Sequence, residues 1–194
     1  KRVLDLSITV PSLILLSPLF LAVAIAIKLE SPGPVFFRQK RVGRSNQQFD
    51  ILKFRSMRAE LCDANGDQST VRDDERITRV GAFIRRTSID ELPQLINVLR
   101  GDMSLVGPRP HALGSLAGDK LFWEVNRRYW VRHALKPGIT GLAQIRGYRG
   151  STLRKEDLEK RLSADLEYLH GWRLWRDISI LFTTAKVLMH RNAY

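Results

Sequence analysis

Two adjacent carboxylates, Asp90 and Glu91, are the residues of this sequence best suited to catalysis. Arg85 and Arg86 lie just upstream of them, and Arg109 follows in a Pro-Arg-Pro segment. In such a group one carboxylate could act as a nucleophile, the other could bind Mg²⁺, and the guanidinium groups could bind phosphate oxygens. The pattern is therefore typical of a phosphoryl-transfer site. The alternative is a network of surface salt bridges without catalytic function.

The segment around Arg109 favours phosphate binding because it is stiff. Pro108 and Pro110 restrict the backbone on both sides of Arg109 and keep it extended. A guanidinium held in this way can bind a phosphate through two parallel hydrogen bonds, for which a flexible lysine is less suited. We therefore assign Arg85, Arg109, Pro108 and Pro110 to phosphate or substrate binding.

The acid pair is predicted at the start of a helix that runs from Asp90 to Arg100. Ser88 and Glu91 stand in capping-box register, and Pro93 is tolerated only in a first turn. The positive end of the helix dipole would stabilise both a carboxylate and a nearby phosphate. A purely structural capping role for the two acids is the alternative. The apolar face of this helix consists of Leu92, Leu95, Ile96 and Leu99.

Several common types of site are excluded because their motifs are absent. The sequence contains neither a P-loop nor a Gly-x-Gly-x-x-Gly fingerprint. Its four histidines lack the His-Glu-x-x-His spacing of a zinc hydrolase. The single cysteine, Cys62, rules out an internal disulfide. Its neighbour Asp63 is expected to raise the pKa of the thiol, which makes Cys62 a poor nucleophile.

Composition and charge narrow the class of partner. The 194 residues are 44% hydrophobic and 27% charged, and 32 Lys and Arg against 20 Asp and Glu give a net charge of +12. The length fits one domain with a sizeable core, and the apolar content excludes a disordered basic tail. The charge indicates nucleic acid, an acidic membrane surface or a phosphorylated substrate. Because no motif that reads nucleic acid is present, we expect no nucleic-acid partner; a membrane-tethered nucleic-acid-binding protein is the alternative from another class.

The apolar residues are concentrated in Leu6–Ile27, which contains no charge. As one straight helix this segment would be about 33 Å long, enough to cross a bilayer core. Ser17 and Pro18 are expected to break it near its centre, because proline removes a donor and its ring opposes the carbonyl one turn earlier. Cations flank both ends, which is typical of the cytoplasmic side. We therefore predict a re-entrant helix-break-helix over residues 1–30; a kinked single-pass helix and a buried hairpin are the alternatives.

The rest of the chain is predicted as mainly helical with one small β-hairpin. Two apolar and basic runs, 35–41 and 49–55, surround a turn and form the hairpin. Residues 62–76 are polar and predict a loop. Further helices are expected over 77–86, 120–134 and 153–190, the last interrupted near Gly171.

Aromatic residues alternate with arginines in two of these helices, over 122–132 and 168–176. This combination favours amphipathic helices at a membrane interface, because each Trp or Tyr ring has an apolar body and a polar edge. Packing into a soluble core is the alternative. The predicted fold is thus a mainly α monotopic membrane protein with a small β-hairpin, a re-entrant helix-break-helix and interfacial amphipathic helices.

Taken together, these features resemble the bacterial sugar transferase family, the monotopic phosphoglycosyl transferases that load a sugar-1-phosphate onto a polyprenyl phosphate. The resemblance covers nearly the whole chain, and no block departs in a way that indicates an inactive member. The matching blocks are Lys1–Asp5, Ser17-Pro18, Ser31–Phe36, Gln39–Gly43, Phe54–Met57, Ser88–Gln94, Gly101–Pro110 and Lys136–Gly141.

The resemblance implies a re-entrant membrane helix and a reaction in two steps. Asp90 would attack the β-phosphorus of a UDP-sugar, which releases UMP and leaves a sugar-phosphoryl-aspartate. Glu91 would hold Mg²⁺ across the diphosphate, while Arg85 and Arg109 would bind phosphate oxygens. Undecaprenyl phosphate would then attack this intermediate. His111 is expected to be a structural or sugar-side neighbour.

The segments 108–112, 147–150 and 191–194 resemble members that start exopolysaccharide synthesis with glucose-1-phosphate. UDP-glucose is therefore the expected donor, with galactose or another UDP-hexose as the alternative. Larger members carry an N-terminal membrane domain, so this chain is expected to be a fragment. Residues 31–194 are expected to form the catalytic domain, in contact with membrane lipids on the cytoplasmic face of the bacterial inner membrane. A homodimer is left open.

Overall fold

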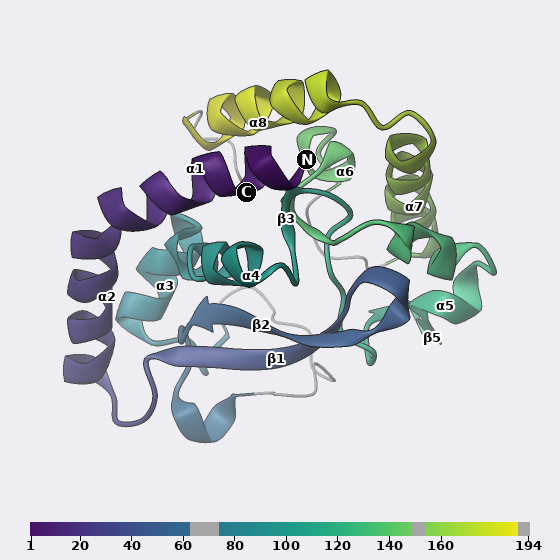
Figure 1. The fold of residues 1–194 in the computed structure, drawn as a ribbon. Helices are drawn as coiled ribbons and strands as arrows, with labels where there is room; N and C mark the ends of the chain where they lie inside the picture. Colours follow the sequence, from purple (N-terminus) through teal and green to yellow (C-terminus); the bar gives the residue numbers. More distant parts are fainter. Residues whose placement is uncertain (63–73, 149–153, 190–194) are drawn as a thin grey trace.

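The computed structural model describes residues 1–62, 74–148 and 154–189. Most of this part is helical and the longest strands form one hairpin, so the predicted mainly α fold with a small β-hairpin is confirmed. In Figure 1, α4 lies centrally between α1 and the hairpin, and it contacts both. The larger elements are α1 (Arg2–Leu15), α2 (Ser17–Glu30), β1 (Phe36–Val42), β2 (Gln48–Phe54), α3 (Arg79–Arg86), α4 (Gln94–Arg100), β3 (Ser104–Val106), β6 (Gly138–Thr140), α7 (Lys155–His170) and α8 (Leu174–Met189). The shorter ones are η1 (Arg44–Asn46), η2 (Ala59–Leu61), η3 (Ile89–Glu91), β4 (Leu116–Ala117), β5 (Lys120–Leu121), α5 (Phe122–Val125), η4 (Tyr129–Ala134) and α6 (Leu142–Ile145).

Helices α1 and α2 meet at a bend of 58°. Pro18 lies in the first turn of α2, where a missing N–H is tolerated, and Ser17 Oγ donates a hydrogen bond to the carbonyl oxygen of Ile14 (2.8 Å). The predicted break at these residues is therefore confirmed. Within the described ranges, no helix alone is long and apolar enough to cross a membrane. The bent pair α1 and α2 taken together reaches that threshold, by length and composition only.

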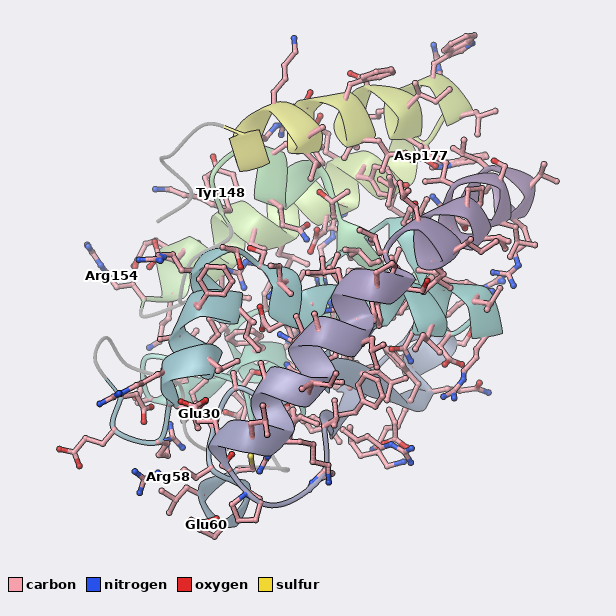
Figure 2. The ribbon with its side chains drawn as sticks, turned by 90° about the vertical axis from the view of Figure 1, so that its left-hand side faces the viewer. Glu30, Arg58, Glu60, Tyr148, Arg154 and Asp177 are labelled. Carbon is pink, nitrogen blue, oxygen red and sulfur yellow. The ribbon has the colours of Figure 1, made fainter. Side chains whose placement is uncertain are left out.

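The bent helix pair is held at both ends by the rest of the molecule. At its start, Lys1 Nζ pairs with Asp177 Oδ2 of α8 (2.6 Å). At its end, the Glu30 carboxylate accepts a hydrogen bond from the backbone N–H of Val80 in the first turn of α3 (3.0 Å). Figure 2 shows Glu30 and Asp177 near opposite ends of the pair. Straightening α1 and α2 into one rod would break at least one of these attachments.

Strands β1 and β2 pair antiparallel, with Phe36 opposite Phe54 and Val42 opposite Gln48. The predicted hairpin is therefore confirmed to within about a residue at each end. Phe54 is buried and its ring packs edge-on against Phe20 of α2, with 5.2 Å between the ring centroids. Because successive side chains of a strand point to opposite faces, Lys53 points away from this contact. Its ammonium group reaches η3 instead.

Strands β3 and β6 form a short parallel pair that depends on glycine. The backbone N–H of Gly107 donates to the carbonyl oxygen of Thr140 (2.9 Å), and that of Gly138 donates to the carbonyl oxygen of Pro108 (2.9 Å). A Cβ atom added to Gly138 would lie 2.1 Å from the nitrogen of Gly107. Any larger residue there would separate the two segments, so glycine is required for the close approach that fixes the chain leading into Arg109.

The prediction of one helix over 120–134 is wrong. This stretch forms β5, α5 and η4 instead, with Asn126 in an extended conformation between α5 and η4. The side-chain oxygen of Asn126 accepts a hydrogen bond from the backbone N–H of Arg128 (2.9 Å). Such a local bond offers the backbone an alternative to helical pairing. Phe122 and Tyr129 are buried, which agrees with the core-packing alternative for these aromatics.

The other helical predictions are largely confirmed. Helix α3 begins two residues later than expected, where the side chain of Thr78 accepts from the backbone N–H of Gly81 (2.9 Å). The long C-terminal stretch divides into α7 and α8 around Gly171, as predicted. Trp175 on α8 is 79% exposed. The outermost residues of the predicted helix 153–190, most of the loop 62–76, residues 149–150 of the segment 147–150 and the whole segment 191–194 lie outside the described residues.

Candidate functional site

Asp90 and Glu91 lie on η3, a single 3₁₀ turn between α3 and α4. The preceding Ser88 has a left-handed backbone (φ 58°, ψ 16°), which is uncommon outside glycine and concentrated at functional sites. The predicted regular helix from Asp90 is wrong in its first turn, and the side chain of Ser88 makes no capping bond. Because Pro93 has no N–H to donate to Ile89, the regular helix begins only at Gln94.

The carboxylate of Glu91 is held by two cations. Arg109 Nη2 lies 2.7 Å and Lys53 Nζ lies 3.0 Å from Glu91 Oε1. All three side chains are at most one quarter exposed, so these ion pairs are poorly screened by water. Burial by itself raises the pKa of Glu91, but Arg109 and Lys53 outweigh it and hold the pKa well below its usual range. Glu91 is therefore a fixed negative charge.

Asp90 has a different environment. Its side chain is buried, yet no hydrogen bond to its carboxylate joins it to another residue that the structure describes. Burial raises the pKa of Asp90, and the charge of Glu91 adds to this, although Lys53, Arg85 and Arg109 act in the opposite direction. A carboxylate that is poorly solvated and not tied up by donors is suited to nucleophilic attack. The two neighbouring acids thus lie in different electrostatic surroundings.

The structure brings both predicted arginines to the acid pair. Arg85, in the last turn of α3, is close enough to lower the pKa of Asp90, and its Nη1 donates to Ser56 Oγ (3.4 Å). Arg109 contacts Glu91 directly, and this ion pair raises the pKa of Arg109. Arg86, by contrast, is exposed on α3. Asp90, Glu91, Arg85 and Arg109 therefore lie together in the structure.

The predicted substrate residues Pro108 and Pro110 are both buried. The carbonyl oxygen of Pro108 accepts from Gly138, so this proline holds the segment against β6. His111 is also buried, and its Nδ1 lies 3.1 Å from Tyr129 Oη. Burial and the surrounding arginines lower its pKa well below the usual value, so the ring is neutral. These environments favour structural roles for Pro108, Pro110 and His111.

Sequence reasoning missed Lys53. The alternation of apolar and basic residues predicted its strand, but several lysines and arginines share the hairpin. Only the packing of β2 against η3 selects Lys53 as the one that reaches Glu91. The pKa of the Cys62 thiol is raised, and burial is the main reason.

The acid pair fits Mg²⁺ shared with a bound substrate. Mg²⁺ is usually held by one or two carboxylates, substrate phosphates and waters. Asp90 and Glu91 supply two such carboxylates on one turn. No group of three or more His, Cys, Asp and Glu side chains gathers in the described part of the chain, so a metal cage made of protein ligands alone is not offered there.

Comparison with known proteins shows the family of this chain. The family model described as "Bacterial sugar transferase" matches residues 1–191. The chain is 51% identical to the undecaprenyl-phosphate glucose phosphotransferase of Komagataeibacter xylinus; the alignment covers the full length of this chain and 37% of that protein. It is 50% identical to the exopolysaccharide production protein PSS of Rhizobium leguminosarum bv. phaseoli; the alignment covers 95% of this chain and 92% of that protein. It is 48% identical to the UDP-glucose:undecaprenyl-phosphate glucose-1-phosphate transferase of Escherichia coli K12; the alignment covers the full length of this chain and 41% of that protein. The chain thus spans about two fifths of the length of the first and third of these relatives.

Proposed function

Because this chain belongs to the bacterial sugar transferase family, we propose that it transfers a sugar-1-phosphate, specifically glucose-1-phosphate, from a UDP-sugar to undecaprenyl phosphate. This step would start exopolysaccharide synthesis at the membrane. The observation that carries the proposal is the site itself: an acid without a hydrogen-bond partner among the described residues beside an acid fixed by two cations. In a purely structural salt-bridge network, a buried Asp90 would be expected to pair with one of the nearby cations that the structure describes.

In the first step, an oxygen of the Asp90 carboxylate attacks the β-phosphorus of the UDP-sugar. The bond from that phosphorus to the bridging oxygen breaks, and UMP leaves with the bond's electron pair. A sugar-phosphoryl-aspartate remains. Negative charge develops on the phosphate oxygens during this step, and Arg85, Arg109 and Lys53, the cations that act on Asp90, would offset it.

In the second step, a phosphate oxygen of undecaprenyl phosphate attacks the same phosphorus, and the Asp90 carboxylate leaves. The product is undecaprenyl-diphosphate-sugar, and the enzyme is restored. A phosphate monoester is already largely ionised at pH 7, because its second pKa is near 6. No dedicated general base is therefore required, which agrees with a neutral, buried His111 that is engaged in structural contacts.

Mg²⁺ is the proposed cofactor. Glu91 would hold it, with Asp90 nearby, and the ion would neutralise the charge of the diphosphate. The chain's own contribution is to keep Glu91 ionised, which the ion pairs with Arg109 and Lys53 do.

A re-entrant placement of the helix pair in the cytoplasmic leaflet of the inner membrane is the second part of the proposal. Both ends of the pair are attached to the same body, and the bend between them is apolar and exposed. A kinked span would need its two ends on opposite sides of the bilayer. The exposed apolar residues of the pair include Val3, Ile14, Leu15, Leu21 and Leu29.

The test is a single-turnover reaction of the membrane-reconstituted protein with UDP-glucose and Mg²⁺ but without acceptor. We expect a burst of UMP that does not exceed one per site, and a hexose-phosphate adduct on the peptide that contains Asp90. An Asp90→Asn variant should form no adduct and lose at least about a thousandfold in turnover. Asp119→Asn, at an exposed carboxylate paired with Lys155, is the matched control and should behave as the parent.

The same assay separates the alternatives. Turnover of Asp90→Asn at the parent rate would refute the covalent mechanism, and intact UDP-sugar after long incubation would favour a non-catalytic scaffold. A panel of UDP-sugars tests the donor: a better rate with a donor other than UDP-glucose would overturn the assignment of glucose alone.

A further inference from the structure

The backbone that carries Arg109 is held by four hydrogen bonds from different elements. Three of them come from backbone groups and one comes from a side chain. The three backbone bonds join Gly107 N to Thr140 O (2.9 Å), Gly138 N to Pro108 O (2.9 Å) and Val42 N to His111 O (3.1 Å). The fourth is made by Arg132, whose Nη2 donates to the carbonyl oxygen of Arg109 (2.7 Å).

The bond from Arg132 controls a torsion that the neighbouring prolines do not. Pro108 and Pro110 fix their own φ angles, and Pro110 confines Arg109 to extended conformations. Within that region the ψ angle of Arg109 still varies over tens of degrees. A donor on the Arg109 carbonyl oxygen fixes this angle, and with it the direction of the whole residue toward Glu91.

Arg132 is itself rigidly held. Its side chain is 1% exposed, and its Nε and Nη2 lie 2.9 Å and 2.7 Å from Asp165 Oδ2 on α7. Its Nη1 lies 2.8 Å from Nδ1 of the neutral His111. With Tyr129 Oη, which lies 3.5 Å from Nη1, the guanidinium contacts four different partners at once, and none of them is Asp90 or Glu91. A lysine could not reproduce this planar set of bonds.

We propose that Arg132, held by Asp165, is a positioning residue for Arg109. Arg132 sets the Arg109 carbonyl so that the Arg109 guanidinium is already aimed at Glu91 and at the diphosphate before substrate binds. The assignment of the diphosphate as the ligand rests on the proposed function. The expected effect is large because a displacement of about 1 Å in a binding group can cost about a hundredfold in rate.

The test is a double-mutant cycle with two readouts, UMP release from UDP-glucose and the Kd for UDP in the presence of Mg²⁺. We expect Arg132→Lys to lower kcat/KM by about 10- to 100-fold and to weaken UDP binding when Arg109 is present. In an Arg109→Ala background the same change should alter either quantity less than about twofold. Arg132→Lys keeps the buried charge beside Asp165, and a thermal melt of each variant reports folding.

Arg146→Gln is the matched control. It removes an arginine that makes a two-bond ion pair with Glu167 on the exposed side of α7, and we expect no change in either readout. Asp165→Asn is the second variant, because it weakens the hold on the Arg132 side chain without changing Arg109. Its losses in kcat/KM and in UDP affinity should also vanish in the Arg109→Ala background. Equal losses with and without Arg109, or no loss in either, would overturn the positioning role.

The two readouts distinguish the failure of this inference from that of the proposed function. If the parent protein releases no UMP but the UDP-binding cycle shows coupling, the proposed reaction is wrong and the positioning role stands. If UMP is released but the cycle is additive, the reaction stands and the positioning role is wrong.

Discussion

Asp90 and Glu91 are neighbours in the chain, but their pKa values shift in opposite directions. Burial acts on both carboxyls, and the difference comes from direct contacts: Glu91 is bonded to Arg109 and Lys53, whereas Asp90 feels these cations only at longer range. Opposed shifts of this kind separate a charged anchor from a reactive group. At the scale of single residues, the placement of cations therefore agrees with the separate roles proposed for Asp90 and Glu91.

Lys53 provides a test at this scale. Its charge lowers the pKa of Asp90, so Lys53→Met should raise that pKa further. The nucleophile must be ionised, and the rate of adduct formation rises as pH increases through the pKa of Asp90. We therefore expect the acid limb of the pH profile for UMP release to move to higher pH in Lys53→Met, with a reduced plateau.

The control for this experiment is Lys40→Met. Lys40 lies on the same hairpin but pairs with Asp50 on its solvent-exposed side. Its removal should leave the profile unchanged. If the acid limb of the pH profile lies at the same pH in Lys53→Met as in the parent, Lys53 does not influence the pKa of Asp90.

At the scale of elements, α3 links the bent helix pair to the site. Its first turn is bonded to Glu30 at the end of α2, and its last turn carries Arg85. The carboxylate of Glu30 meets unpaired N–H groups at the positive end of the helix dipole, which is a stabilising arrangement. The conformation of α2 is in this way connected to the position of a cation beside Asp90.

Glu30→Gln tests this connection. The substitution removes the charge from the α3 N-terminus and weakens its bonds to the N–H groups of Arg79 and Val80. We expect a loss of about 0.5–1 kcal/mol in the free energy of unfolding, measured by denaturant titration. Glu60→Gln is the comparison, because Glu60 is an exposed carboxylate in η2, outside the first turn of α3. Equal stabilities for the two variants would contradict the capping role.

At the scale of the whole molecule, the attachments of α1 and α2 determine how the chain could meet a membrane. Lys1 is tied to α8 and Glu30 to α3, so both ends of the pair face one body while the bend projects apolar side chains. The net charge of +12 divides accordingly. Arg85, Arg109 and Lys53 act on the acid pair, and in the proposed membrane placement Lys28, which is exposed in the last turn of α2, would face anionic lipid.

Site-directed labelling tests this arrangement. In a Cys62→Ser background, single cysteines are introduced by Arg2→Cys and Lys40→Cys and are treated with a membrane-impermeant reagent in oriented vesicles. We expect both positions to react from the same side, because a re-entrant pair returns the chain to the side it left. Reaction from opposite sides would establish a span and exclude the re-entrant placement.

The sequence by itself determined the features that depend on short spacing. The acid pair, the stiff segment around Arg109 and the break at Pro18 follow from adjacent residues, and the hairpin follows from alternation along two short runs. Only the tertiary structure decided which distant groups complete the site. Lys53 reaches Glu91 across 38 positions and Arg132 reaches Arg109 across 23, through the packing of β2 on η3 and of η4 on α7. The left-handed backbone of Ser88 and the burial of Phe122 and Tyr129 on either side of the break near Asn126 also appear only in the tertiary structure, because packing of distant side chains can outweigh the small preference of each residue for a helix.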